Sequence, residues 1–141
     1  YAAGQAGDRF CVRNSGALAV VEGCGTNGCE YMTGGSAIIL GSIGDNFGAG
    51  MTGGSSFIYS EQPNILDMMN RENIDTYQVM DENWKNYLFK ILVDFNKQTK
   101  SKRAAFIIEN FDKEITKFIH VVPDEVIDKL SFPVKENHKI A

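Results

Sequence analysis

The chain has 141 residues, of which 43% are hydrophobic and 23% are charged, and its net charge is −4. This length suits one domain, and the composition excludes a disordered chain and a membrane-spanning one. The weak negative charge favours neither nucleic acid nor a membrane as a partner, and we expect neither. Three cysteines (Cys11, Cys24 and Cys29) are an odd number without a framework spacing, so we expect a reducing cytoplasm rather than a disulfide-built secreted domain.

The two halves of the chain differ in backbone chemistry. Residues 1–54 contain all 14 glycines, whereas all three prolines follow residue 60. We therefore divide the chain into a Gly-rich part at 1–60, a helical cap region at 61–132 that packs on or beside it, and a polar tail at 133–141. The join falls near Pro63, a residue type that stops a strand or opens a helix.

The Gly-rich part repeats every 19 residues. Gly16, Gly35 and Gly54 each precede a short run with aliphatic or aromatic residues, and the three glycines are equally spaced. A fixed period near 20 residues is typical of stacked units, none of which buries its apolar face alone. We therefore predict a parallel β-solenoid of 19-residue rungs, with glycines at corners that need a positive φ. A flat Gly-rich sandwich is the alternative.

The sequence pattern of the second half predicts mainly helix. Apolar residues recur every three or four positions over 84–95, and Asp81 is placed to cap that helix. A second helix is expected from near Ser101, and a short one from Pro123 to Leu130. Between them, residues 117–122 are expected to be extended.

Two GxGxxG motifs, at 23–28 and 48–53, are the first candidates for a cofactor site. A dinucleotide site needs a strand before such a motif and a helix after it, so that the pyrophosphate meets the helix N-terminus. Neither motif is followed by a helical pattern. We therefore interpret both as corner glycines of the solenoid.

Cysteine and histidine residues are the next candidates. Cys24 and Cys29 lie five residues apart, but His120 and His138 are distant in the sequence, so no tetrahedral metal site is complete. In the 19-residue register the cysteines do not stack on one another. A Ser–His–acid arrangement stays open, although the chain has no GxSxG motif and His120 is placed like a strand residue. We name no catalytic, cofactor-binding or metal-ligating residue.

Four segments within Gly7–Gly54 closely resemble one known family: RFCVRNSG, VVEG, GCEYMTGG and NFGAGMTGG. They resemble the C-terminal GxGxG (β-helix) domain of the glutamate synthase large (alpha) subunit. Downstream, the family pattern continues at Thr99, Ser101, Phe118, Val121, Pro123 and Leu130. The resemblance covers about residues 2–132. It implies a right-handed parallel β-helix, in agreement with the 19-residue period found independently.

The resemblance also implies a place in glutamate biosynthesis. The family's enzyme makes two glutamates from glutamine and 2-oxoglutarate, with electrons from a pyridine nucleotide or ferredoxin. Its chemistry belongs to other domains, an amidotransferase with an N-terminal Cys and a barrel with FMN and an iron–sulfur cluster. Tyr1 is not that nucleophile, and the cysteine spacing here differs from that of the cluster ligands. We therefore expect no cofactor in this chain, which also has fewer rungs than the family's domain.

Three functions compete on these grounds. The first is a non-catalytic scaffold domain or fragment of glutamate synthase that positions the amidotransferase and FMN domains, with the remaining domains of the large subunit as partners. The second is a free-standing β-solenoid interaction protein without enzymatic activity, which self-associates through its open end because residues 1–60 carry no Lys or Pro to discourage edge pairing. The third, an independent enzyme, lacks a visible nucleophile–base or metal set.

Overall fold

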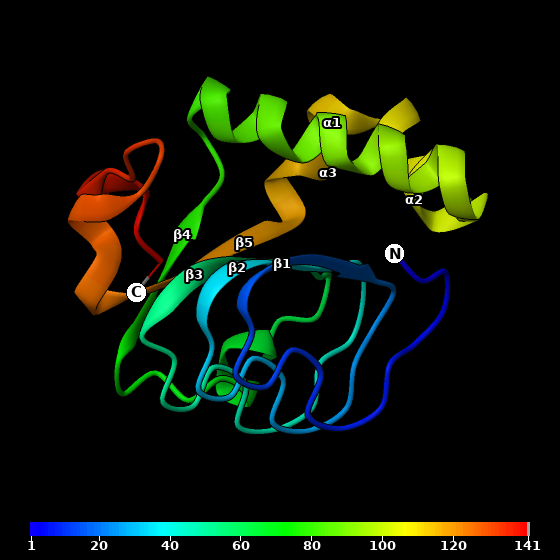
Figure 1. Cartoon of the computed structure of the whole chain (residues 1–141). Coiled ribbons are helices and arrows are strands. Elements are labelled where there is room, and N and C mark those ends of the chain that lie inside the picture. Colours follow the sequence, from blue (N-terminus) through cyan, green and yellow to red (C-terminus); the bar gives the residue numbers. More distant parts are fainter. Residues whose placement is uncertain (141) are drawn as a thin grey trace.

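The first three strands of the fold come from the three successive repeats. A computed structural model describes residues 1–140 (Figure 1). Strands β1 (Ser15–Val21), β2 (Thr33–Ile39) and β3 (Gly53–Tyr59) are each seven residues long and pair in parallel. The repeat seen in the sequence therefore places one strand per unit side by side.

Two further strands, both from the second half of the chain, complete the sheet. β5 (Phe118–Pro123) pairs antiparallel with β3, and β4 (Ile74–Gln78) pairs antiparallel with β5. The strand order is β1-β2-β3-β5-β4. One mixed sheet of five strands thus spans both halves of the chain.

This sheet corrects the predicted fold class, because the right-handed parallel β-helix or solenoid is wrong. The structure is a small mixed sheet with helices, and the sheet is not curled into repeated rungs. Each repeat supplies a single strand, whereas a β-helix needs strands from each turn in more than one sheet. The rest of each repeat is turn and irregular backbone. The antiparallel β5 then ends the series of equivalent strands after β3.

Helices cover one face of this sheet. The α-helices are α1 (Glu82–Thr99), α2 (Lys102–Glu109) and α3 (Phe111–Glu114). The short 3-10 helices are η1 (Ile65–Met68), η2 (Ile115–Lys117), η3 (Asp124–Lys129) and η4 (Glu136–His138). Within residues 1–140 no helix is long and apolar enough to cross a membrane.

The helix caps confirm the prediction for this region. Asp81 precedes α1, and its carboxylate accepts a hydrogen bond from the Asn83 N–H at 2.8 Å. Ser101 caps α2 by accepting from the Ala104 N–H at 3.1 Å. Such caps satisfy N–H groups that have no partner within the helix, so these two residues set where the helices begin.

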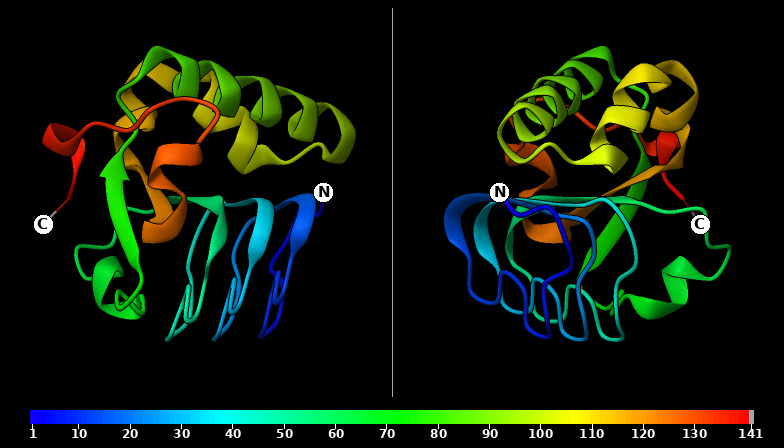
Figure 2. Two further views of the ribbon diagram at one scale, coloured as in Figure 1. Left: turned by 60° about the vertical axis from the view of Figure 1, so that its left-hand side comes forward. Right: turned by 90° about the vertical axis from the view of Figure 1, so that its right-hand side faces the viewer.

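The sheet divides the core into two layers (Figure 2). Alternate strand residues point to opposite faces. Ile38 and Phe57 pack on the helix side with the buried residues of α1, such as Leu88 and Phe95. Ile39 and Ile58 belong to the other layer, which the connecting loops enclose. Burial on both faces explains why the strands end in continuous apolar runs.

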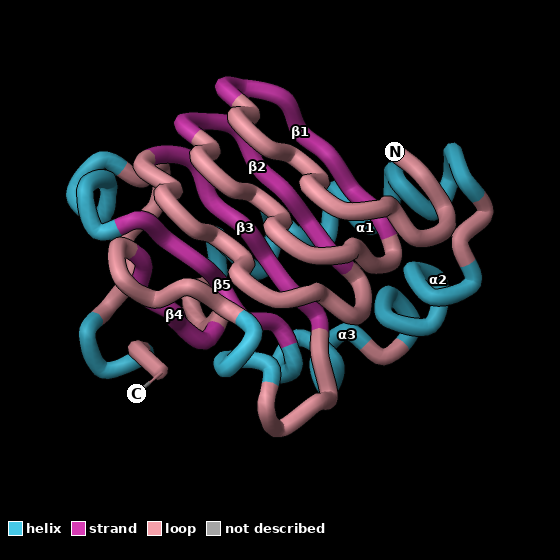
Figure 3. Tube along the Cα trace, turned by 90° about the horizontal axis from the view of Figure 1, so that it is seen from below, coloured by secondary structure: helices cyan, strands magenta, loops and turns pink. Residues whose placement is uncertain are grey.

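The connecting loops also lie side by side, as Figure 3 shows from below. The Arg9 N–H donates to Thr26 O at 2.8 Å, and the Asn27 N–H donates to Asp45 O at 2.9 Å. Successive loops are therefore joined by backbone hydrogen bonds, although they form no second sheet.

Left-handed backbone recurs at equivalent points of successive repeats. Gly35 and Gly54 have φ values of 83° and 78°, as predicted for these glycines, whereas Gly16 has no positive φ. In the first two loops, three alternate residues each adopt a positive φ. These residues are Arg9, Cys11 and Arg13 in the first loop, and Asn27, Cys29 and Tyr31 in the second. The first two loops thus match at a spacing of 18 residues, as β1 and β2 do from the Leu18–Ser36 pair onward, whereas β2 and β3 match at 19.

The close approach at Gly35 generates a stability prediction. A Cβ at Gly35 would collide with the backbone of Ala17 on β1, because the Ala17 nitrogen would lie only 2.8 Å from that Cβ. We expect Gly35→Val to lower the free energy of unfolding by about 2–4 kcal/mol, more than a change in backbone propensity alone. Urea unfolding would measure this loss.

Gly16→Val is the matched control, because a Cβ there meets nothing within 4 Å and the backbone φ is not positive. Equal stability of the Gly35→Val and Gly16→Val variants would show that the close strand contact has no energetic weight.

Candidate functional site

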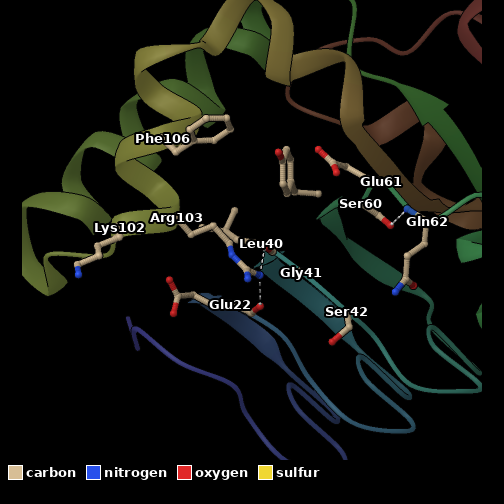
Figure 4. Close-up of a pocket in the computed structure, with 11 residues that line it drawn as sticks. Glu22, Leu40, Gly41, Ser42, Ser60, Glu61, Gln62, Lys102, Arg103 and Phe106 are labelled. Atoms are coloured by element: carbon tan, nitrogen blue, oxygen red, sulfur yellow. Dashed lines mark hydrogen bonds between the residues drawn. The ribbon is translucent and has the colours of Figure 1, made fainter.

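A cavity lies where the three parallel strands end. It has a volume of about 680 Å³ and opens between these strand ends and α2 (Figure 4). Glu22, Gly41 and Ser60 follow β1, β2 and β3 respectively, while Arg103 and Phe106 come from α2. Parallel strands bring their carboxyl ends to one edge of the sheet, which explains why segments distant in sequence share this cleft.

Arg103 anchors α2 to the strand ends. Its guanidinium donates to the backbone oxygen of Leu40 at 2.9 Å and to that of Glu22 at 3.2 Å. A Cβ at residue 41 would collide with this guanidinium and with Glu22 O, so Gly41 leaves the space that Arg103 occupies. Figure 4 shows both hydrogen bonds.

A second contact joins the same two elements. The Ser101 hydroxyl, which caps α2, donates to the Glu22 carboxylate at 2.6 Å. The helix N-terminus also favours a negative charge nearby. We call the contacts of Ser101 and Arg103 with Glu22 and Leu40 the α2 anchor. It links residues about 80 positions apart in the sequence.

The opposite side of the cleft is occupied by a charged network. Tyr59 donates to the Glu114 carboxylate at 2.6 Å, and the Lys117 ammonium lies 2.8 Å from the same carboxylate. The bonds from Lys117 and Tyr59 lower the pKa of Glu114. Burial and the bond to Glu114 raise the pKa of Tyr59 to about 12. Glu61 forms a further ion pair with Lys117. With the pKa of Glu114 lowered and that of Tyr59 raised, Glu114 is ionised and Tyr59 is protonated near neutral pH.

A smaller cavity of about 480 Å³ opens at the other end of the strands. Trp84 and Tyr87 of α1 line it together with Phe132, and its floor includes the glycines at the starts of β2 and β3. The Tyr87 and Ser36 hydroxyls are 2.8 Å apart, so α1 is also joined to the sheet at this end.

Sequence reasoning left a Ser–His arrangement open, and the structure places one beside this smaller cavity. His120 Nε2 lies 3.1 Å from Ser55 Oγ. The imidazole is fully buried and stacks on Phe57 with ring centroids 4.2 Å apart. Burial lowers the pKa of His120 to about 3, so the ring does not readily accept a proton at neutral pH. The pair is therefore poorly suited to activating Ser55 as a nucleophile.

The three cysteines are closer in space than the sequence indicated. Cys24 and Cys29 are buried in the loop-side core, and Cys11 packs against it. Cys11 and Cys29 lie side by side in adjacent loops, where the Cys29 N–H donates to Phe10 O at 2.7 Å, which corrects the expectation that the cysteines do not stack. The error came from the assumed 19-residue register, because the first two repeats match at 18. In the part of the chain that the structure describes, no group of three or more His, Cys, Asp or Glu residues could hold a metal ion.

The two GxGxxG segments both lie in connections between strands. Residues 23–28 belong to the connection from β1 to β2, and residues 48–53 lead into β3. Neither is followed by a helix that would present its N-terminus to a phosphate. The α2 anchor, by contrast, was missed from the sequence, although Gly41 directly after an apolar run is a signal for close approach.

Comparison with known proteins gives a consistent result. The sequence profile of the GXGXG motif family matches residues 1–124. Glutamate synthase (NADH) of Schizosaccharomyces pombe is 43% identical over 125 residues, which are 89% of this chain and 6% of that protein. Glutamate synthase (NADPH) large chain of Azospirillum brasilense is 47% identical over 134 residues, covering 95% of this chain and 9% of that protein. Ferredoxin-dependent glutamate synthase of Antithamnion sp. is 40% identical over 123 residues, covering 87% and 8%.

The α2 anchor yields a measurable prediction. Arg103→Met keeps the aliphatic stem but removes the donors to Glu22 O and Leu40 O. We expect this variant to lose about 1–2 kcal/mol of unfolding free energy in urea denaturation, because a charged donor bonded to a carbonyl contributes on this scale. The neighbouring Lys102→Met is the control and should change stability by less than about 0.5 kcal/mol. Equal effects of the two substitutions would contradict the assignment.

Proposed function

Because this chain belongs to the GXGXG motif family, we propose that it is a non-catalytic scaffold domain of a glutamate synthase large subunit. The relatives described above are glutamate synthases, and the chain spans less than a tenth of the length of each. The proposed partners are the remaining domains of that subunit, the amidotransferase and the FMN domain, which this domain would hold in position.

The observation that supports a structural role is the state of the reactive side chains. His120 is buried beside Ser55, and Cys29 is fully buried. Glu114 is paired with Lys117, and Arg103 donates to strand-end carbonyls. Side chains that could act in catalysis are thus engaged in contacts within the fold. This favours a domain that supports a reaction carried out by a neighbouring domain.

The names of the relatives supply a second argument. The three differ in electron donor, NADH, NADPH or ferredoxin, yet they match this chain at 43%, 47% and 40% identity. A domain that bound the donor would be expected to differ between these classes. Similar identity across them supports a role common to all three, such as holding the other domains.

FMN and an iron–sulfur cluster do not fit this chain, and we propose that other domains hold them. A cluster needs several thiolate ligands around one centre, and residues 1–140 contain no such group. A flavin phosphate favours a helix N-terminus after a glycine loop, and neither GxGxxG segment leads into a helix. The three free thiols support the cytoplasmic location expected from the sequence.

The two-layer fold is suited to the scaffold role. The α2 anchor fastens the helices to the sheet at the strand ends, and the Ser36–Tyr87 contact fastens α1 near the strand starts. A helix layer that is attached at both ends cannot slide over the sheet. Domains bound to this body would therefore keep a fixed separation.

The proposal predicts an inactive domain that works only in its parent protein. The purified chain should show no flavin absorbance and form no glutamate from glutamine and 2-oxoglutarate with NADH, NADPH or reduced ferredoxin. Azospirillum brasilense glutamate synthase, assayed in parallel, is the positive control. A chimera in which this chain replaces the matching segment of that large chain should retain glutamate formation. Turnover by the isolated chain, or a folded chimera without turnover, would contradict the proposal.

A free-standing assembly protein is the second candidate, favoured by one observation. β1 forms an edge of the sheet, and its residues Ser15 to Leu18 are exposed. Residues Ala2 and Gly4 hydrogen-bond only near its far end, at Val20 and Glu22. An exposed strand edge without Lys or Pro pairs readily with another chain. This candidate would make self-association the function of the chain.

Light scattering over a dilution series tests that candidate. Self-association through β1 predicts an average mass that rises with concentration, and a lower mass for Leu18→Lys, which places a charge at the edge. Met80→Lys is the control, since Met80 is an equally exposed apolar residue (50%, against 41% for Leu18) away from β1. A monomer at all concentrations would exclude this candidate and leave the scaffold proposal intact.

A further inference from the structure

Cys11 and Cys29 occupy equivalent positions in two adjacent loops. Both have left-handed backbone, with φ values of 60° and 56°. The Cys29 N–H donates to Phe10 O at 2.7 Å, and the Arg13 N–H donates to Glu30 O at 2.9 Å. The two cysteines are therefore directly side by side in the stack of loops, with matching backbone orientation.

The spacing of these loops suits a covalent link. Backbone segments joined by such hydrogen bonds lie about 4.8 Å apart. Disulfides join residues whose Cα atoms are about 4.4–6.8 Å apart. Cys29 belongs to the loop-side core and Cys11 packs against that core, so both side chains lie in the same region. The spacing of the two backbone segments is therefore within the range that a disulfide spans.

We propose that Cys11 and Cys29 form a redox-active pair that closes to a disulfide when a peroxide oxidises Cys11. This is a modification site in the first two repeats, and it does not depend on the scaffold function.

The chemistry proceeds in two balanced steps. The Cys11 thiolate attacks one oxygen of the peroxide and breaks the O–O bond, which forms a sulfenic acid at Cys11 and releases water or an alcohol. The Cys29 sulfur then attacks the Cys11 sulfur, which forms the S–S bond and breaks the S–O bond, and the hydroxyl group leaves as water with the proton that Cys29 gives up. Two thiols are oxidised by two electrons, and one peroxide is reduced.

Exposure decides which cysteine reacts first. Cys11 is partly exposed, whereas Cys29 is fully buried and cannot meet the oxidant. Interaction with the Cys29 thiol lowers the pKa of Cys11, and interaction with the Cys11 thiol, together with burial, raises the pKa of Cys29. Cys29 Sγ also lies 3.4 Å from Ser56 Oγ, which helps to hold it beside Cys11. Cys11 is thus the attacking thiol and Cys29 the resolving one.

Cys24 remains outside the pair. It is buried, and burial raises its pKa to about 11, so it is not the thiol that meets the peroxide first. It lies within the connection from β1 to β2, five residues before Cys29, and it lacks an equivalent cysteine in the adjacent loops. Oxidation should therefore leave one free thiol per chain.

Peptide mapping after oxidation tests the pair. The full chain is treated with one equivalent of hydrogen peroxide, remaining thiols are alkylated, and trypsin releases residues 10–13 and 14–71. We expect these peptides to be joined, with a mass two hydrogen atoms below their sum, and to separate after dithiothreitol. One alkylated thiol, Cys24, should remain.

Three variants assign the link. Cys24→Ser should still give the joined peptides, whereas Cys11→Ser and Cys29→Ser should not. Circular dichroism verifies that each variant folds. If Cys29→Ser unfolds, the loss of the joined peptides in Cys11→Ser still tests the link, because Cys11 is only partly buried. Joined peptides that depend on Cys24 would overturn the assignment, as would a chain that keeps three free thiols or oxidises only to a sulfinic acid at Cys11.

Discussion

The antiparallel pairing of β3 with β5 is the interaction on which the rest of the structure depends. Tyr59 pairs with Phe118, and Ser56 pairs with Val121. This pairing joins the Gly-rich half to the helical half through one sheet and ends the series of parallel strands. It also brings His120 beside Ser55, and Glu114 and Lys117 beside Tyr59. Both cavities are lined by residues from both halves of the chain.

Local features of the fold were predictable from the sequence, and long-range pairing was not. The cap at Asp81, the beginning of a helix near Ser101 and the positive φ at Gly35 follow from short-range chemistry, and all three are confirmed. The predicted solenoid was wrong because periodicity shows that units are equivalent but not how many sheets they form. β4 was missed, since its five residues carry little pattern of their own.

The candidate sites were harder still to predict. The α2 anchor joins Glu22 to Arg103, which are 81 residues apart in the sequence. The spacing of residues along the chain does not indicate contacts over such a separation. The cysteine pair was missed for a different reason. Ala37 pairs with Ser56 of β3 at a spacing of 19 but with Ala19 of β1 at 18, and Cys11 and Cys29 share the spacing of 18 because they belong to the first two repeats. A single-residue shift of register is enough to separate or to join two thiols.

The distance along the chain between β3 and β5 has a consequence during biosynthesis. Ribosomes add about 5–20 residues per second, so β5 emerges about 3–12 seconds after β3. During that interval β3 has an open edge, and its buried residues Phe57 and Ile58 lack the layers that later cover them. Pairing over such a separation is slow to nucleate. The nascent chain is therefore most exposed to misassembly at the ribosome, where a chaperone or a preceding domain would have its greatest effect.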